Sequence, residues 1–111
     1  MSAFSDNSHC RAWGRFTANS TTIQESFNIT SIADTATGRM TVTIATDFAA
    51  ATWAGQVTLE ANNADAAVLV PSLDTGGIAA GTCILECWLV GTTTEVLTDP
   101  TSWCFAGFGG Q

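Results

Sequence analysis

Apolar and polar residues alternate along much of the chain, and the alternation has the two-residue period of β-strands. The clearest case is segment 39–46, in which Met40, Val42 and Ile44 are separated by threonines. Because successive side chains of a strand point to opposite faces, this segment is predicted to be a strand with one buried face. The turn before it ends in Gly38, where a positive φ angle is expected. No segment shows the period of an amphipathic helix.

Similar patterns predict further strands, separated by residues that favour turns. Segment 82–90 is apolar on both sides, so we expect it to be a central strand or to lie at an interface. Ile32 is out of phase with Ile29, which indicates a β-bulge between them. Segment 47–51 is predicted to form one helical turn at most. The other predicted strands are residues 10–17, 22–30, 53–61, 66–70 and 103–108. Residues 91–100 are expected to form a threonine-rich loop or to contain a short strand at 94–97.

The spacing of these strands predicts the fold class. Strands that recur roughly every ten to fifteen residues without a helical pattern indicate an all-β protein. We therefore expect an antiparallel β-sandwich, jelly-roll-like, of about seven to eight strands with no substantial helix. A chain of 111 residues accommodates one such domain, which we assign to residues 10–111. Residues 1–9 are polar apart from Phe4, and we predict an N-terminal arm that orders only against a neighbouring molecule.

The first predicted strand, 10–17, differs from the others because neither of its faces is purely polar. One face carries small and apolar residues, namely Cys10, Ala12, Gly14 and Phe16. The other face carries Arg11, Trp13 and Arg15. Such a pattern suits a strand that lies between a core and a subunit contact. Arg11, Trp13 and Arg15 are therefore the candidate oligomer contact.

Composition and charge exclude two classes of partner. Hydrophobic residues make up 46% of the chain and charged residues only 12%, which is about half the usual share for soluble domains. Three arginines against ten acidic residues give a net charge of −7. Nucleic-acid binding needs clustered basic residues, so we expect no nucleic-acid partner. No segment approaches the ~20 apolar residues of a membrane helix, and the N-terminus lacks a signal-peptide pattern, so we expect no membrane insertion.

The four cysteines are interpreted mainly as buried free thiols that pack like small hydrophobic residues. In a strand, Cys83 and Cys87 would lie about 13 Å apart, which is too far for a disulfide. A bridge between Cys10 and Cys104 stays open, because the terminal strands of β-domains often pair. His9 beside Cys10 adds only one further ligand, so we expect no metal site and no cofactor.

No group of residues in the sequence suits catalysis. A hydrolase would need a general acid and a general base brought together, and neither a nucleophile elbow nor a Cys-His pair is evident. Five of the six aspartates lie mostly in predicted turns, where this residue bonds to the backbone; they are Asp34, Asp47, Asp65, Asp74 and Asp99. We therefore expect no catalytic residues and no enzymatic activity.

The segment from Ala12 to about Phe48 carries a recognisable order of motifs. It reads Ala12-Trp13-x-x-Phe16, then Ser26-Phe27-Asn28-Ile29-Thr30-Ser31-Ile32-x-Asp34, then Thr37-Gly38-x-x-Thr41-Val42. This order resembles a repeating module of bacteriophage tail fibres and related virion appendages. The later Asp99-Pro100-Thr101, followed by an apolar strand and Gly107-Phe108-Gly109, looks like the end of the same module. Gly14 and Arg15 stand where the module usually has Val-Asn.

This resemblance implies a non-enzymatic structural protein of a phage virion. The expected role is a symmetric appendage subunit, as in a tail fibre, a head spike or a capsid decoration. It would be assembled in the cytoplasm of the bacterial host and lie on the exterior of the particle. Its expected partners are its own copies and other virion proteins of the capsid or tail. The resemblance favours a homotrimer, whereas a capsid vertex would impose a pentamer.

An alternative is a lectin-like module that binds carbohydrate on the host surface. Exposed tryptophans would stack on the sugar rings of a surface polysaccharide, although tryptophans more often fill a core or an interface. Among Trp13, Trp53, Trp88 and Trp103, the best candidate for exposure is Trp53, because it follows a predicted loop. Trp53 is therefore the candidate glycan contact. The motif itself transfers no receptor-binding residues.

Overall fold

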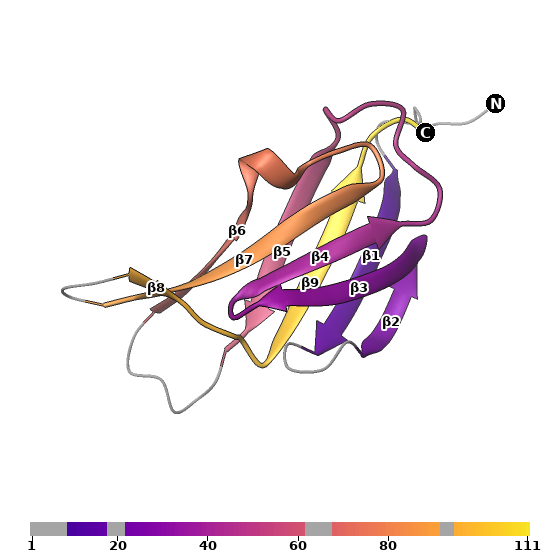
Figure 1. The fold of residues 1–111 in the computed structure, drawn as a ribbon. Coiled ribbons are helices and arrows are strands. Elements are labelled where there is room, and N and C mark those ends of the chain that lie inside the picture. Colours follow the sequence, from indigo (N-terminus) through magenta and orange to yellow (C-terminus); the bar gives the residue numbers. More distant parts are fainter. Residues whose placement is uncertain (1–8, 18–21, 62–67, 92–94) are drawn as a thin grey trace.

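The computed structural model describes residues 9–17, 22–61, 68–91 and 95–111, which form two antiparallel sheets packed face to face (Figure 1). Sheet A has the strand order β2-β1-β9-β5, with β1 (Cys10–Thr17), β2 (Ile23–Phe27), β5 (Ala54–Glu60) and β9 (Ser102–Phe108). Sheet B has the order β3-β4-β7-β6, with β3 (Ile29–Ala36), β4 (Arg39–Ile44), β6 (Val68–Leu73) and β7 (Thr82–Val90). The short β8 (Glu95–Leu97) also pairs with β7.

The predicted antiparallel β-sandwich is confirmed, with nine strands in the described residues rather than about seven or eight. The bounds of β1 and β7 match the predicted segments, and β7 is a central strand between β4 and β6. The strand predicted over 66–70 overlaps β6, and its first residues lie outside the described ones. Most of the predicted arm, residues 1–8, also lies outside them.

The predicted strand 22–30 is divided in two by Asn28. This residue has a φ angle of 60°, a left-handed conformation that asparagine tolerates better than most residues. Its side-chain amide donates to the carbonyls of Arg11 (2.9 Å) and Thr46 (3.1 Å), and its Oδ1 accepts from the Thr46 N–H at 2.7 Å. Asn28 therefore fixes the point at which the chain leaves sheet A and enters sheet B.

The hairpin of β3 and β4 has the predicted features. The register shifts between Ile29 and Ser31, which confirms the predicted bulge. Gly38 has a φ angle of 73°, as expected for its turn. Its N–H donates to Asp99 Oδ1 at 2.7 Å, and a Cβ at this position would lie 2.6 Å from the Thr98 nitrogen. The motif around Gly38 and the later motif that begins at Asp99 are far apart in the sequence and therefore meet at this turn.

Residues 47–51 form no helical turn, which accords with the prediction of at most one. The N–H groups of Phe48 and Ala49 donate to the carbonyls of Ala80 and Gly110, so these residues bond to two other loops instead of to each other. Phe48 is buried and anchors the crossing from β4 to β5. A 3-10 helix, η2 (Thr75–Gly77), follows Asp74, whose carboxylate accepts from the Gly76 N–H at 2.9 Å.

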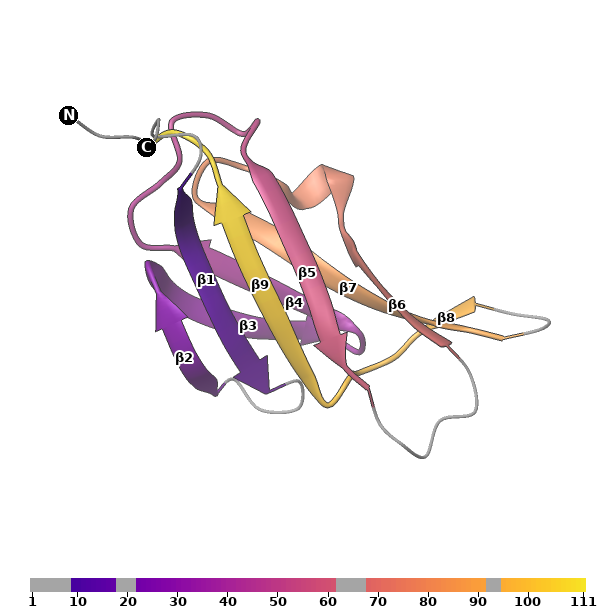
Figure 2. The same cartoon turned by 180° about the vertical axis from the view of Figure 1, so that it is seen from behind.

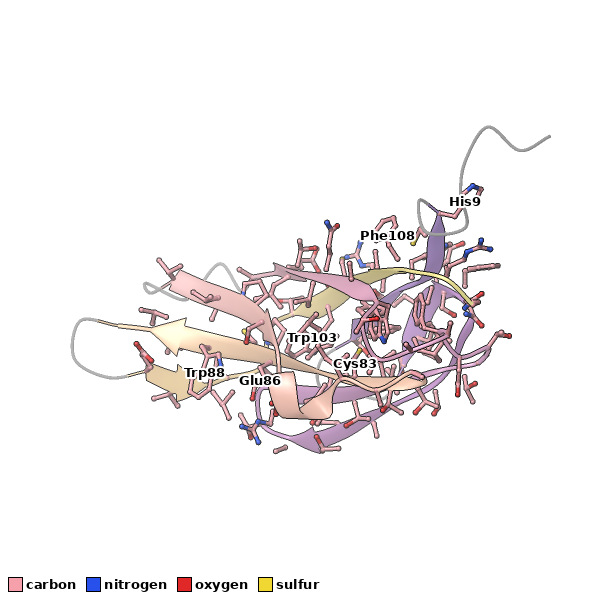
Figure 3. The ribbon with its side chains drawn as sticks, turned by 90° about the horizontal axis from the view of Figure 1, so that it is seen from above. His9, Cys83, Glu86, Trp88, Trp103 and Phe108 are labelled. Carbon is pink, nitrogen blue, oxygen red and sulfur yellow. The ribbon has the colours of Figure 1, made fainter. Side chains whose placement is uncertain are left out.

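The core lies between the two sheets. Its largest fully buried side chains come from four strands and include Phe16, Met40, Leu85 and Trp103. Met40, Val42 and Ile44 are all buried, as the alternation in this segment predicts. In the view from above, Trp103 and Cys83 lie between the sheets, whereas Phe108 and Trp88 lie on opposite outer sides (Figure 3).

The molecule is elongated, with extents of 52 × 26 × 25 Å. The elongation arises because sheet B is longer than sheet A in one direction. The ends of β6 and β7 that meet β8 project past the strands of sheet A, as both side views show (Figures 1 and 2).

Candidate interaction surfaces

The first candidate surface is the outer side of sheet A, which faces the viewer in Figure 2. We call it the A face. Trp13 is paired with Phe27 of β2 and with Ala106 of β9, and Ala106 is paired with Gln56 of β5. Paired residues share one side of a sheet, so these side chains form a row across it. The A face comprises Trp13, Arg15, Glu25, Phe27, Gln56, Thr58, Glu60, Cys104, Ala106 and Phe108. Arg11 lies at the register shift before Ala12 and is placed on the same side by its alternation with Trp13.

Two large aromatic residues of the A face are open to solvent. Trp13 is 39% exposed and Phe27 is 54% exposed. They are direct cross-strand partners, so their Cβ atoms lie about 5 Å apart and the two rings form one patch. Beside them is a shallow hollow of about 140 Å³, lined by Gln56, Thr58, Cys104, Phe105 and Ala106. Contiguous exposed aromatic surface of this kind is typical of an interaction site.

The charges of the A face lie around this patch. Arg15 Nη2 lies 3.2 Å from both carboxylate oxygens of Glu60, across β9. Both side chains are about half exposed, and such pairs contribute at most about 1 kcal/mol to stability. The predicted contact residues Arg11, Trp13 and Arg15 thus share one outward face, with Arg11 partly buried. Their role in an oligomer stays a prediction.

The second candidate surface is the projecting end of sheet B, which we call the tip. It consists of three rows of cross-strand neighbours, each with one residue from β6, β7 and β8: Val68, Val90 and Glu95; Leu69, Leu89 and Val96; Val70, Trp88 and Leu97. The first and third rows lie on the outer side of the sheet and the second on the inner side. Val68, Val70 and Val96 are 67%, 40% and 52% exposed. The tip is therefore apolar on both sides, and parts of both sides are uncovered.

The apolar pattern predicted that segment 82–90 is central or at an interface, but it did not single out the end of this segment or its neighbours β6 and β8. The signal of the tip is present in the runs Val68-Leu69-Val70 and Trp88-Leu89-Val90, which are apolar in both phases of a strand. A strand with two apolar sides is ordinarily buried on both. Nothing in the sequence distinguished burial within the chain from burial against a partner.

The predicted exposure of Trp53 is wrong, and with it the assignment of Trp53 as the glycan contact. Trp53 is 7% exposed and stacks on Phe48 with a centroid distance of 4.6 Å. Its ring also meets Phe105 edge-on at 5.9 Å, and its Nε1 donates to the Ala79 carbonyl at 2.8 Å. The indole closes one end of the core.

Glycines of β9 and the segment after it make room for this indole. A Cβ on Gly109 would lie 2.8 Å from the Trp53 Cβ, and one on Gly107 would lie 3.1 Å from the indole ring. A hollow of about 410 Å³ adjoins Trp53 and is lined by Ala49, Ala50, Thr52, Ala54, Phe108, Gly109 and Gly110. None of these lining residues carries a carboxyl, imidazole, amino or thiol group.

The disulfide left open between Cys10 and Cys104 is not formed. Cys10 is paired with Phe108 and Cys104 with Arg15, so the two cysteines are separated by roughly 13 Å or more along neighbouring strands. None of the four cysteines forms a disulfide. Cys83 and Cys87 are buried, as small hydrophobic residues would be, and burial raises the pKa of the Cys83 thiol to about 12. This thiol is therefore neutral and unreactive at neutral pH.

The described residues contain neither a cluster of metal-binding side chains nor a helix that could span a membrane. No group of three or more His, Cys, Asp or Glu side chains in this part of the chain is arranged to hold a metal ion. None of its helices is long and apolar enough to span a membrane. Asp74 and Asp99 bond to backbone N–H groups, as predicted for turn residues, whereas Asp65 lies outside the described residues.

The sequence matches no protein-family model, and comparisons with curated proteins and with solved structures found no similar protein. The resemblance to phage appendage modules therefore rests on the motifs quoted above.

Proposed function

We propose that this protein is a non-enzymatic structural subunit that associates with its own copies in a phage virion appendage. The observation that carries the proposal is the presence of two separate uncovered apolar surfaces, the A face and the tip, on a chain of only 111 residues. Isolated exposed apolar residues are ordinary, but contiguous patches usually mark contacts with other molecules.

Burial of the exposed apolar side chains of the A face and the tip would favour permanent contacts between subunits. Full burial of a large apolar side chain contributes about 1.5–3 kcal/mol, and at least five such side chains in the described chain are 39% or more exposed. With charged residues at 12% of the chain, few groups would have to lose hydration when these surfaces meet a partner. Obligate subunits have interfaces of this apolar kind.

The virion context rests on the resemblance, and the roles of the motif residues support it. Asn28 positions the crossing between the sheets, and Gly38 and Asp99 close the β3–β4 turn. Residues with such backbone roles would persist among proteins that share this sandwich and differ elsewhere. The motif is therefore suited to mark this sandwich, and the place on the exterior of a particle comes from the resemblance alone. A trimer is the favoured assembly, and a pentamer would follow from a place at a capsid vertex.

The proposal is tested first by the mass of the purified protein in solution. Light scattering after size-exclusion chromatography at micromolar concentration should give a single closed oligomer, with a trimer favoured. A monomer across the micromolar range would contradict the proposal. Immunolabelling of purified phage particles with an antibody to this chain then tests the location, and an absence of label on intact particles would contradict the virion role.

A second function, carbohydrate binding, is favoured by one specific observation. Trp13 and Phe27 form an exposed aromatic patch flanked by the polar residues Gln56, Thr58 and Glu25. A sugar ring would stack on the indole and hydrogen-bond to these polar groups. With Trp53 buried, Trp13 takes its place in this hypothesis. Titration with bacterial surface polysaccharides should then change the tryptophan fluorescence of the wild type and not that of a Trp13→Phe variant.

A further inference from the structure

We infer that the free edge of β5 is a docking site for an extended segment of a second protein, which adds a strand to the four-stranded sheet A beside the tip. The site goes beyond the proposed self-association and does not require it. β5 is the last strand of sheet A on the side towards which the tip projects (Figure 2). Among the described residues, β5 pairs with β9 on one side and with no strand on the other.

The backbone of β5 presents three residues to this edge. The Glu60 carbonyl accepts from the Thr101 N–H at 2.8 Å, next to the pair that Glu60 forms with β9, so the backbone groups of Glu60 point towards β9. Backbone groups alternate in direction along an antiparallel strand, so those of Gly55, Val57 and Leu59 point away from β9. A row of unpaired N–H and C=O groups is a template to which another strand binds.

The other edge strands among the described residues are each protected against such pairing. β2 has a charged residue, Glu25, at its centre, β3 is interrupted by two register shifts, and β8 is only three residues long. In β6, Pro71 lacks an N–H donor. By contrast, β5 pairs with β9 over seven residues without a shift, and its one charged residue, Glu60, lies at its end beside Arg15. Because charges, bulges, prolines and short strands protect edges, the unprotected β5 edge indicates a partner.

The inner side of the tip lies over the space beside this edge. β5 and β6 are close at one end, where a Cβ on Gly55 would lie 2.7 Å from Leu73 Cδ1. Towards the tip the two strands diverge (Figures 1 and 2). There β6 carries Leu69 on its inner side, in one row with Leu89 and Val96. A strand added to β5 directs every second side chain against this row.

The core-facing side chains at this edge are incompletely covered within the chain. Val57 and Leu59 are only partly buried, whereas Trp103 and Phe105 of the neighbouring β9 are 1% and 4% exposed. Leu69 is also partly buried and packs against the core. These contacts specify the chemistry of the partner. It is an extended segment of about seven residues with apolar side chains at alternate positions, and it is poor in acidic groups because this chain carries −7.

The space beside the tip selects a segment of another protein over a strand of a second copy. A strand in this space must offer its own inner side to Leu69, Leu89 and Val96. In a second copy, the strands of sheet A and the base of sheet B already have their inner sides against the opposite sheet. The edge strands of its tip are the short β8 and the proline-containing β6. A segment that is extended and outside any folded sheet has both of its sides available.

The experiment titrates the full chain with the end-blocked peptide Lys-Thr-Val-Thr-Val-Thr-Val-Lys and follows amide hydrogen exchange by NMR. The amide protons of Val57 and Leu59 should exchange rapidly in the free protein. With saturating peptide they should exchange about tenfold more slowly or less, because they gain hydrogen bonds to the added strand. The amide protons of Gln56 and Thr58 already bond to β9 and should keep their rates.

A substitution in β5 tests the same hydrogen bonds. Val57→Pro removes one N–H from the edge and leaves the bonds to β9 in place, because an edge strand tolerates proline where its N–H points away from the neighbouring strand. This variant should bind the peptide about tenfold more weakly or less. The matched control, Val57→Ala, shortens the same side chain and keeps the N–H, so it should bind within about threefold of the wild type. If Val57→Pro does not fold, the exchange measurement on the wild type decides.

Three results would overturn the inference. The first is an absence of peptide binding, and the second is protection by the peptide at β2 or β3 instead of β5. The third is slow exchange of the Val57 and Leu59 amide protons without peptide, either in the monomer or only in the assembled wild type, because the edge would then be covered by this chain or by a second copy. Self-association is measured separately by light scattering, so either proposal can fail while the other stands.

Discussion

The two halves of β7 belong to one strand and have different surroundings. In the first half, Cys83, Leu85 and Cys87 point into the sandwich and are fully buried. In the second half, Trp88, Leu89 and Val90 are only partly buried, although they are at least as apolar. Sheet A covers the first half and ends before the second (Figure 1). An apolar strand therefore continues past the point at which its own chain can bury it, and the remainder is available to a partner.

The largest effect is expected from Val42→Asp in β4, because Val42 packs beside the covered half of β7. Val42 is fully buried and paired with Cys83, so the change places a carboxylate in the core without a partner. A loss of about 5 kcal/mol or more is expected, which should prevent folding. Far-UV circular dichroism would detect the loss. Thr41→Asp, one residue away on the opposite side of β4, should fold, and a folded Val42→Asp would contradict the core assignment.

A second change acts on the crossing between the sheets. Asn28→Ala removes three side-chain hydrogen bonds and places alanine at a φ angle of 60°. The free energy of unfolding should fall by about 2–4 kcal/mol, as measured by urea denaturation. Asn28→Gly loses the same bonds without the backbone strain, so it should be about 1 kcal/mol more stable than the alanine variant. Wild-type stability in the alanine variant would contradict the role of Asn28.

A third change tests an uncovered apolar surface, the A face. Trp13→Ala removes the indole from the A face and should weaken assembly by about tenfold to a hundredfold. The stability of the monomer should change by about 1 kcal/mol or less, because the residue is 39% exposed. Sedimentation equilibrium and urea denaturation measure the two effects separately. A large loss of stability with unchanged assembly would assign Trp13 to the core instead of the interface.

The smallest expected effect is a pH dependence from the core of the covered half. The Cys83 thiol has a pKa of about 12 in the fold against 9.0 in the unfolded chain. Both states are neutral below pH 9, and above it only the unfolded state ionises, so stability should fall as the pH rises from 9 to 12. The loss at pH 10 should be about 1 kcal/mol. Urea denaturation at pH 8 and pH 10 would measure it, and Cys83→Ala should lack this part of the decrease.

The sequence predicted the fold best where alternation was clean. Met40, Val42 and Ile44 located β4, and the phase change at Ile32 located the bulge, because one covered face produces a two-residue period. The division at Asn28 was missed because both flanking segments alternate and only the φ angle of one residue separates them. Local patterns do not report a change of sheet.

The candidate sites were predicted less well, for a physical reason. Arg11, Trp13 and Arg15 were placed on one outward face because strand geometry alone dictates it. The burial of Trp53 depends on Gly107 and Gly109, which are more than fifty residues away in sequence. The tip was missed because its character depends on where sheet A ends. The burial of Trp53 and the exposure of the tip are both determined by tertiary structure, which no local sequence pattern contains.

The position of β9 has a consequence for how the chain folds during synthesis. This strand is the last of the described strands, yet it lies in the middle of sheet A, between β1 and β5. Sheet A therefore cannot close until β9 has left the ribosome, whereas β3 and β4 can pair early as a local hairpin. A chain that lacks β9 would expose the edges of β1 and β5 and the apolar core beneath them, so premature truncation should yield aggregates instead of a smaller domain.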